Sequence, residues 1–137
     1  MDILERCTES CRRQPGTVAF PDSLDPRALQ AAAQLKRDGL AEPVLVQSPF
    51  AVRSKMRESA LRSAGFVVVD HASPSLLAKN ADMYAAIRKD AGKPVTEEQA
   101  RKTVACPLSA GAMMVRRGEV EVGVAGNLST TAAVLRA

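Results

Sequence analysis

The stretch from residue 121 to residue 136 reads EVGVAGNLSTTAAVLR. Its valine-rich first part predicts a buried strand that breaks at Gly126. The hydroxyl-rich segment from Ser129 to Thr131 then predicts the start of a helix, which carries Arg136 about two turns later. Free N–H groups and the positive end of a helix dipole favour anions, so we expect an anion site at this turn.

Earlier in the chain, short apolar runs alternate with helical segments. The strands are expected at 17–20, 44–46, 66–69 and 120–125. The helices are expected at 2–13, 26–38, 48–63, 73–89, from 96 to before Pro107, and from there to before Gly118. This order predicts one α/β domain over residues 1–137, with three layers: a mainly parallel sheet and helices on both of its faces.

Several helix starts carry a recognisable signal. Asp25-Pro26, Ser48-Pro49 and Ser73-Pro74 each place an N-cap residue before a proline. Thr96 and Gln99 have the spacing of a capping box. At the other end of a helix, Ala64-Gly65 is expected to stop the segment that begins at Ser48.

Composition limits the class of protein. Of the 137 residues, 46% are hydrophobic and 25% are charged, and the formal net charge is +4. The basic residues are dispersed and aromatic residues make up 3%, so we expect no nucleic-acid partner. The sequence has no apolar run of the roughly 18–20 residues that cross a membrane, and its first residues are charged, so we expect a cytosolic protein without a membrane partner.

The sequence lacks the common catalytic and cofactor motifs. It has no P-loop, no G-x-G-x-x-G fingerprint and no G-x-S-x-G elbow. Cys7 and Cys11 are four residues apart, but they and the single histidine, His71, do not make a metal site. We therefore expect no metal, and we interpret the two cysteines as small residues packed on a helix.

Three stretches resemble the N-terminal part of the phosphate acetyl/butyryl transferases, the phosphotransacetylases. The first is FPDSLDPRALQAA at 20–32 with DGLAEPVLV at 38–46. The second is IRK at 87–89 before KPVTEEQA at 93–100, and the third is GEVEVGVAGNLSTT at 118–131 with LR at 135–136. The sequence at 21–22 and 125–129 is most similar to that of the ethanolamine-utilisation members. Association with a microcompartment therefore stays open.

The resemblance implies a reaction in which acetyl-CoA and phosphate give acetyl phosphate and coenzyme A (CoA). It implies CoA as a substrate, no tightly bound cofactor, and a homodimer for a full-length member. A general base takes the thiol proton of CoA, and cationic groups bind the phosphate.

The resemblance also selects substrate-binding residues. It points to Arg88 and Arg136, whose permanent charge and planar fork suit phosphate. The segment that lines the cleft adds Gly126, Asn127, Ser129, Thr130 and Thr131. From the residues alone, the hydroxyl groups could equally cap a helix, Arg88 could offset a helix dipole, and Arg136 could be a solvated surface charge.

Family members continue where this sequence stops at Ala137, and the resemblance places the general base in that continuing half. We therefore expect an N-terminal fragment or truncated product that has no catalytic residue and is inactive alone. Two other functions stay open. One is a non-catalytic interaction or assembly module, which a large exposed apolar patch beside the final helix would favour. The other is a phosphate- or nucleotide-binding α/β domain.

Overall fold

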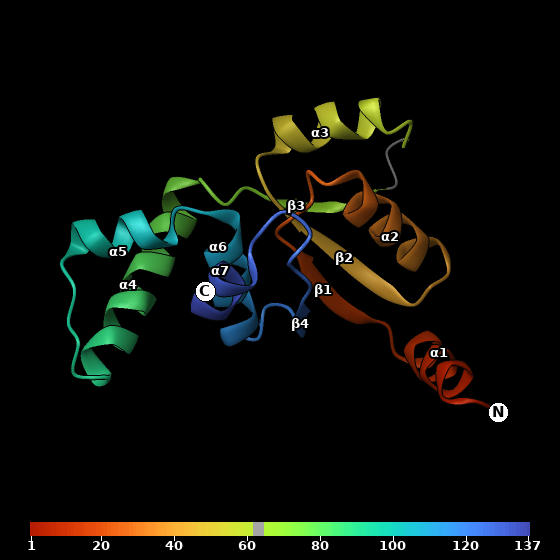
Figure 1. Ribbon diagram of the computed structural model, residues 1–137, viewed down its shortest axis with the longest axis horizontal. Helices are drawn as coiled ribbons and strands as arrows, with labels where there is room; N and C mark the ends of the chain where they lie inside the picture. The colour runs from red at the N-terminus through yellow and green to blue at the C-terminus, as the bar shows by residue number, and fades with distance from the viewer. Residues whose placement is uncertain (62–64) are drawn as a thin grey trace.

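The computed structural model describes residues 1–61 and 65–137 and has a four-stranded parallel sheet at its centre (Figure 1). The strand order is β3-β2-β1-β4. The strands are β1 (Gly16–Phe20), β2 (Ala41–Val46), β3 (Val67–Val69) and β4 (Val122–Gly123). Every neighbouring pair is parallel, as the alternation of strands and helices predicts.

Helices cover both faces of the sheet. They are α1 (Ile3–Arg13), α2 (Pro26–Arg37), α3 (Pro49–Glu58), α4 (Pro74–Asp90), α5 (Glu97–Val104), α6 (Pro107–Arg116) and α7 (Thr131–Arg136). Helices α2 and α3 pack on one face, and α6 packs on the other. Helices α4 and α5 pack together beside α6, while α1 extends away from the end of the sheet (Figure 1). The predicted three-layer α/β architecture is confirmed.

The central strands send alternate side chains to opposite faces, as the strand period of two requires. Ala19, Val44 and Val46 pack with Met114 of α6 and its neighbours. Phe20 and Leu45 pack instead with buried side chains of α2 and α3. Because both faces of the sheet are covered here, residues 18–20 of β1 and 44–46 of β2 are continuous apolar runs.

Two helix starts are built as the sequence predicts. Asp25 caps α2 by accepting a hydrogen bond from the Arg27 N–H, and Pro26 takes the first helical position. Thr96 and Gln99 form a reciprocal capping box at α5. Both motifs satisfy helix N–H groups that have no partner within the helix.

The strand predicted at 120–125 is wrong in length and in burial. Strand β4 has only two residues and pairs with β1 alone, so it lies at the edge of the sheet. Val122 is 48% exposed and Val124 is 45% exposed, whereas Val120, just before the strand, is buried. An edge position leaves one side of a strand without a neighbour, and a valine-rich run does not reveal this in advance.

The helix predicted at 48–63 is also shorter than expected. Helix α3 ends at Glu58, and Ala60 has a positive φ of 53°. The N–H of Leu61 reaches back to the carbonyl of Met56, which closes the helix in a Schellman arrangement. Ser63 and Ala64, the predicted end and stop of this helix, lie outside the described residues.

The prediction that Cys7 and Cys11 are packed is wrong. Both thiols are exposed on α1, because this helix contributes no buried residue. Ile3 and Leu4 on the same helix are also largely exposed. Helix α1 is held as a helix by its own capping box between Asp2 and Glu5 rather than by burial.

Candidate functional site

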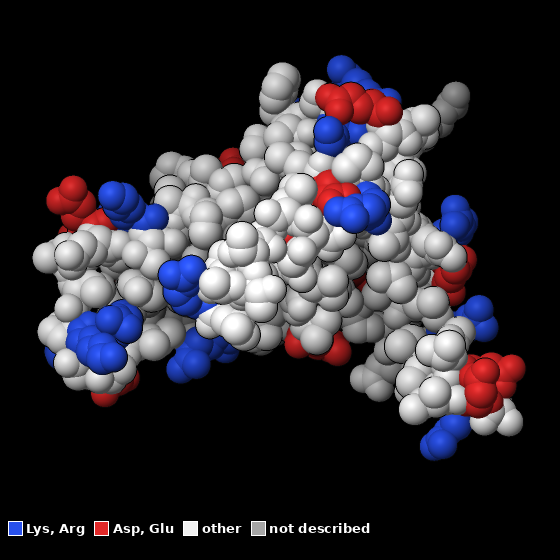
Figure 2. Space-filling view, viewed as in Figure 1, with Lys and Arg blue, Asp and Glu red and all other residues white. Residues whose placement is uncertain are grey.

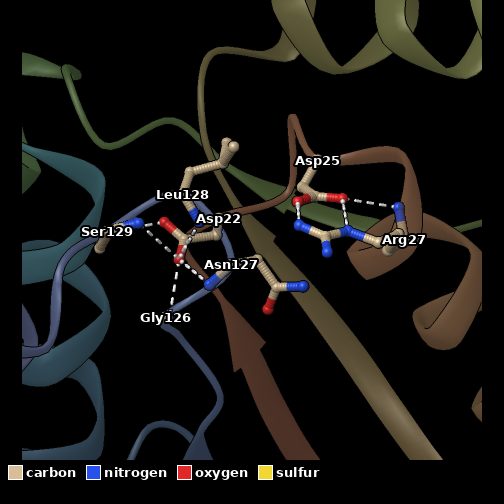
Figure 3. A network of polar contacts seen from close by, with 7 residues as sticks. All are labelled: Asp22, Asp25, Arg27, Gly126, Asn127, Leu128 and Ser129. Carbon is tan, nitrogen blue, oxygen red and sulfur yellow. Dashed lines mark hydrogen bonds and ion pairs between the residues drawn. The ribbon is translucent and has the colours of Figure 1, made fainter.

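The loop after β4 wraps around the carboxylate of Asp22, which lies in the loop after β1 (Figure 3). Asp22 Oδ2 accepts hydrogen bonds from four consecutive backbone N–H groups. Their nitrogens lie at 2.8 Å for Gly126, 3.0 Å for Asn127, 3.2 Å for Leu128 and 3.4 Å for Ser129. The Ser129 hydroxyl donates to the other oxygen, Oδ1, at 2.7 Å.

This arrangement favours the ionised form of Asp22. Burial by itself raises the pKa of this carboxyl group, but the hydrogen bonds from Ser129, Gly126 and Leu128 outweigh it. The pKa of Asp22 therefore lies below its ordinary value. Successive N–H groups that converge on one point form an anion-binding nest, and here the anion is the protein's own carboxylate.

Gly126 gives the loop its shape. Its φ is 111°, a conformation that residues with a Cβ atom rarely adopt. The turn at Gly126 directs the following N–H groups at Asp22. The predicted anion site at this turn is therefore an internal contact in this structure, and binding of substrate by Gly126, Asn127 or Ser129 stays a prediction.

The other two hydroxyl residues belong to the start of the final helix. Thr130 is the N-cap of α7, and its Oγ1 accepts a hydrogen bond from the Ala133 N–H at 3.2 Å. Thr131 is the first helical residue and is exposed. Capping accounts for the position of Thr130, and contact of either threonine with substrate also stays a prediction.

A second acidic side chain beside the nest is already paired. Asp25 accepts bonds from Arg27 Nε at 3.1 Å and Nη2 at 2.7 Å (Figure 3). The Arg27 hydrogen bond lowers the pKa of Asp25. Asp25 therefore stays ionised, caps α2 and pairs with Arg27. A carboxylate with a lowered pKa is poorly suited to act as a general base.

The structure brings Arg88 and Arg136 together at one pocket of about 290 Å³. Arg88 comes from the last turn of α4 and Arg136 from the last turn of α7. A third arginine, Arg116 in the last turn of α6, lines the same pocket. We call this the arginine pocket; its remaining walls are Tyr84, Ile87, Ala112, Met113 and Ala137.

The arginine pocket has three cationic groups and no carboxylate side chain in its lining. Within residues 1–61 and 65–137, no ion pair involves Arg88, Arg116 or Arg136. Figure 2 shows basic side chains beside the C-terminal end of α7, where the pocket lies. Uncompensated guanidinium groups in one concave site favour an anionic ligand.

The hydrogen bonding of two arginines differs. Arg136 Nε donates to the carbonyl of Ala132 at 2.9 Å, within its own helix. Arg88 Nε is buried and has no hydrogen-bond partner among the described residues. A buried donor without a partner costs free energy, so a ligand oxygen that reached Arg88 would relieve that cost.

Sequence reasoning selected Arg88 and Arg136 but missed Arg116. Arg116 and Arg117 are consecutive, and only Arg117 has a carboxylate partner, Glu119. The sequence does not show which arginine of the doublet pairs with Glu119, so no signal in it could have singled out Arg116.

Two further features of the described chain bear on cofactors and location. Among residues 1–61 and 65–137, no cluster of three or more His, Cys, Asp or Glu residues is placed to hold a metal ion. No helix in the same part of the chain combines the length and the apolar character that a membrane crossing needs.

Comparison with known proteins gives consistent matches. The model of the family described as phosphate acetyl/butaryl transferase matches residues 2–137. The phosphate acetyltransferase of Acetivibrio thermocellus is 32% identical over 136 residues, which are 99% of this chain and 40% of that enzyme. This chain therefore spans about 40% of the length of that relative.

Two solved structures have the same fold. A phosphotransacetylase from Streptococcus pyogenes matches with a TM-score of 0.83 and 24% identity, over 99% of this chain and 41% of its own. The EutD phosphotransacetylase from Staphylococcus aureus matches with a TM-score of 0.77 and 22% identity, over 94% of this chain and 40% of its own. These two structures confirm the α/β fold, and the family match over residues 2–137 confirms the resemblance stated from the sequence.

Proposed function

The chain belongs to the phosphate acetyl/butaryl transferase family, and on that premise we propose that its arginine pocket binds the phosphate groups of the substrates of phosphate acyl transfer. The reaction converts acetyl-CoA and phosphate into acetyl phosphate and CoA. The observation that carries the proposal is the convergence of Arg88, Arg116 and Arg136 on one pocket without a carboxylate side chain in its lining.

The proposed contribution of this chain is binding and charge neutralisation. Two oxygens of one phosphate can each accept an N–H group from the same guanidinium, which fixes the orientation of the phosphate as well as its position. In the transfer reaction, such cations also stabilise the negative charge that develops on the acyl and phosphoryl oxygens.

Proton transfer needs a different residue. The described lining of the arginine pocket contains no aspartate, glutamate or histidine that could take the thiol proton of CoA. We propose that this proton acceptor comes from the part of the family fold that the chain does not span. It follows that the 137-residue chain binds substrate but does not turn it over.

Calorimetric titration with CoA tests the proposal. The chain is expected to bind CoA, and Arg88→Gln and Arg136→Gln are each expected to weaken binding about tenfold, because each removes a charge-assisted contact. Arg53→Gln removes one charge from an exposed position on α3 and is the matched control. Binding that both pocket variants leave unchanged would overturn the proposal.

A specific surface supports the interaction module as a second candidate function. Four apolar side chains along β4, the following loop and α7 are strongly exposed: Val122, Val124, Leu128 and Leu135. An apolar groove of about 280 Å³, lined in part by Leu108, Val115 and Val134, reaches the final helix, whereas Val122 and Val124 line another pocket beside α1. Exposed apolar surface of this kind favours association with another polypeptide.

The partner proposed for this surface is the part of the family fold that the chain does not span. Co-purification of the chain with that segment of the Acetivibrio thermocellus enzyme tests it. Leu135→Asp is expected to reduce recovery of the complex, and Phe50→Asp, at an exposed apolar residue on α3, is expected to leave it unchanged. Equal recovery with both variants would contradict this assignment.

A further inference from the structure

We propose that Arg116 is a third phosphate-binding residue of the arginine pocket and that it distinguishes CoA from ligands with a single phosphate. This inference rests on the proposed function, because it assumes that the pocket binds the substrates of phosphate acyl transfer. The starting observation is that Arg116 lines the pocket together with Arg88 and Arg136.

The neighbouring residue, Arg117, shows what an arginine with a structural role looks like in this region. Its Nε and Nη2 donate to the two carboxylate oxygens of Glu119 at 2.8 Å and 3.0 Å. Its Nη1 donates to Asn80 Oδ1 at 2.6 Å. The bond to Asn80 ties α4 to the end of α6, and the Arg117 side chain is only 12% exposed.

Glu119 is therefore not available to Arg116. Both of its oxygens are held by Arg117, and Lys79 also pairs with it. The hydrogen bonds from Arg117 and Lys79 lower the pKa of Glu119 to about 2. Arg116 is exposed and has no ion-pair partner in the described part of the chain, so its charge faces the pocket without compensation.

Helix dipoles do not account for three arginines at this place. Each of the three lies in the last turn of a helix, where a cation offsets a partial charge of roughly −0.5. Three guanidinium groups against three helix ends leave an excess of roughly +1.5, which the α-carboxylate of Ala137 in the pocket lining lowers to roughly +0.5. A bound anion would neutralise this excess and remove the repulsion among the three like charges.

The pocket has the size of a small ligand site. Its volume of about 290 Å³ is close to the lower end of the roughly 300–1,000 Å³ that ligand pockets span. Tyr84, Ile87 and Met113 add aromatic and apolar surface to the lining. CoA matches these features, because it carries a diphosphate, a further phosphate and an adenosine group, whereas acetyl phosphate carries one phosphate on a small acyl group.

The experiment compares the dissociation constants of CoA and of inorganic phosphate at low ionic strength. The proteins are the 137-residue chain, its Arg116→Gln and Arg116→Lys variants, and Arg53→Gln as the control. Arg116→Gln is expected to weaken CoA binding about tenfold and phosphate binding less than twofold. Arg116→Lys is expected to recover part of the affinity, because it keeps the charge and loses the planar fork.

The outcomes separate this inference from the proposed function. If the wild-type chain binds neither CoA nor phosphate, the proposed function is overturned, and this inference with it. If the wild type binds CoA and Arg116→Gln binds it equally well, only the role of Arg116 is overturned. Equal weakening by Arg116→Gln and Arg53→Gln would also overturn that role, because it would reveal a general charge effect. Circular dichroism confirms that each variant is folded.

Discussion

The Ser129 hydroxyl donates a 2.7 Å hydrogen bond to Asp22 Oδ1, across 107 positions of sequence. Together with four backbone N–H groups, this bond attaches the loop after β4 to the loop after β1. The final helix, α7, follows this loop directly, and it carries Arg136 into the arginine pocket. The position of one wall of the pocket therefore depends on Asp22.

Asp22→Asn is expected to destabilise the chain by about 2 kcal/mol, because an amide offers one acceptor oxygen and turns an NH₂ group toward other N–H donors. For a chain of this size, the loss corresponds to a Tm lower by about 6 °C. Urea unfolding and thermal melting measure both quantities. Asp82→Asn, at an exposed position on α4, is the control, and equal stability of the two variants would contradict the role of Asp22.

The charge network at Glu119 makes the free energy of unfolding depend on pH in the acid range. Its pKa is lowered from 4.5 to about 2 by Arg117 and Lys79, so the folded state binds the proton less well than the unfolded state. The contribution is complete above the unfolded pKa and is lost as the pH falls from about 4.5 through about 2. Glu119→Gln is expected to remove it.

Urea unfolding of wild type and Glu119→Gln at several values of pH checks this expectation. At pH 7 the variant is expected to be less stable by about 1 kcal/mol, since the network is partly exposed to solvent. The difference should shrink steadily toward pH 2. A difference that does not depend on pH would show that the network acts through packing rather than charge.

Gly126→Ala is expected to destabilise the chain by about 1–3 kcal/mol, because a residue with a Cβ atom is strained at a φ of 111°. Gly123→Ala is the matched control on the same segment. An added Cβ atom there meets only the Val115 side chain at 3.6 Å, an ordinary contact distance, and its φ is not in the strained range. Thermal melting compares the two, and similar Tm values would argue against strain at Gly126.

The chain alone is expected to show no appreciable transferase turnover, because its arginine pocket has no residue that could accept the thiol proton. A coupled assay that follows CoA release from acetyl-CoA and phosphate measures this. The phosphate acetyltransferase of Acetivibrio thermocellus serves as the positive control. A rate comparable to that enzyme would show that the chain supplies its own base.

Local signals in the sequence predicted what depends on a few neighbouring residues. The cap at Asp25 and the capping box at Thr96 follow from backbone groups within one turn, so their residue types were sufficient. The parallel sheet followed from the order of strands and helices. Ser48 and Ser73 marked helix starts correctly, although neither side chain makes a capping hydrogen bond.

Features that depend on distant residues were not predictable in this way. The exposure of β4 depends on its having a single neighbour in the sheet, and the binding of Asp22 by the loop after Gly126 joins residues more than 100 positions apart. The family resemblance selected Arg88 and Arg136. Arg116 needed the structure, because only the packing of α4 against α6 shows that Arg117 takes the Glu119 carboxylate.

The most direct test of the account maps CoA onto the chain by two-dimensional ¹H–¹⁵N NMR. The largest shift changes are expected at the last turns of α4, α6 and α7, around Arg88, Arg116 and Arg136, and they should vanish in an Arg88→Gln/Arg136→Gln double variant. Shift changes centred on residues 126–129, or changes that persist in the double variant, would contradict the assignment of the arginine pocket as the substrate site.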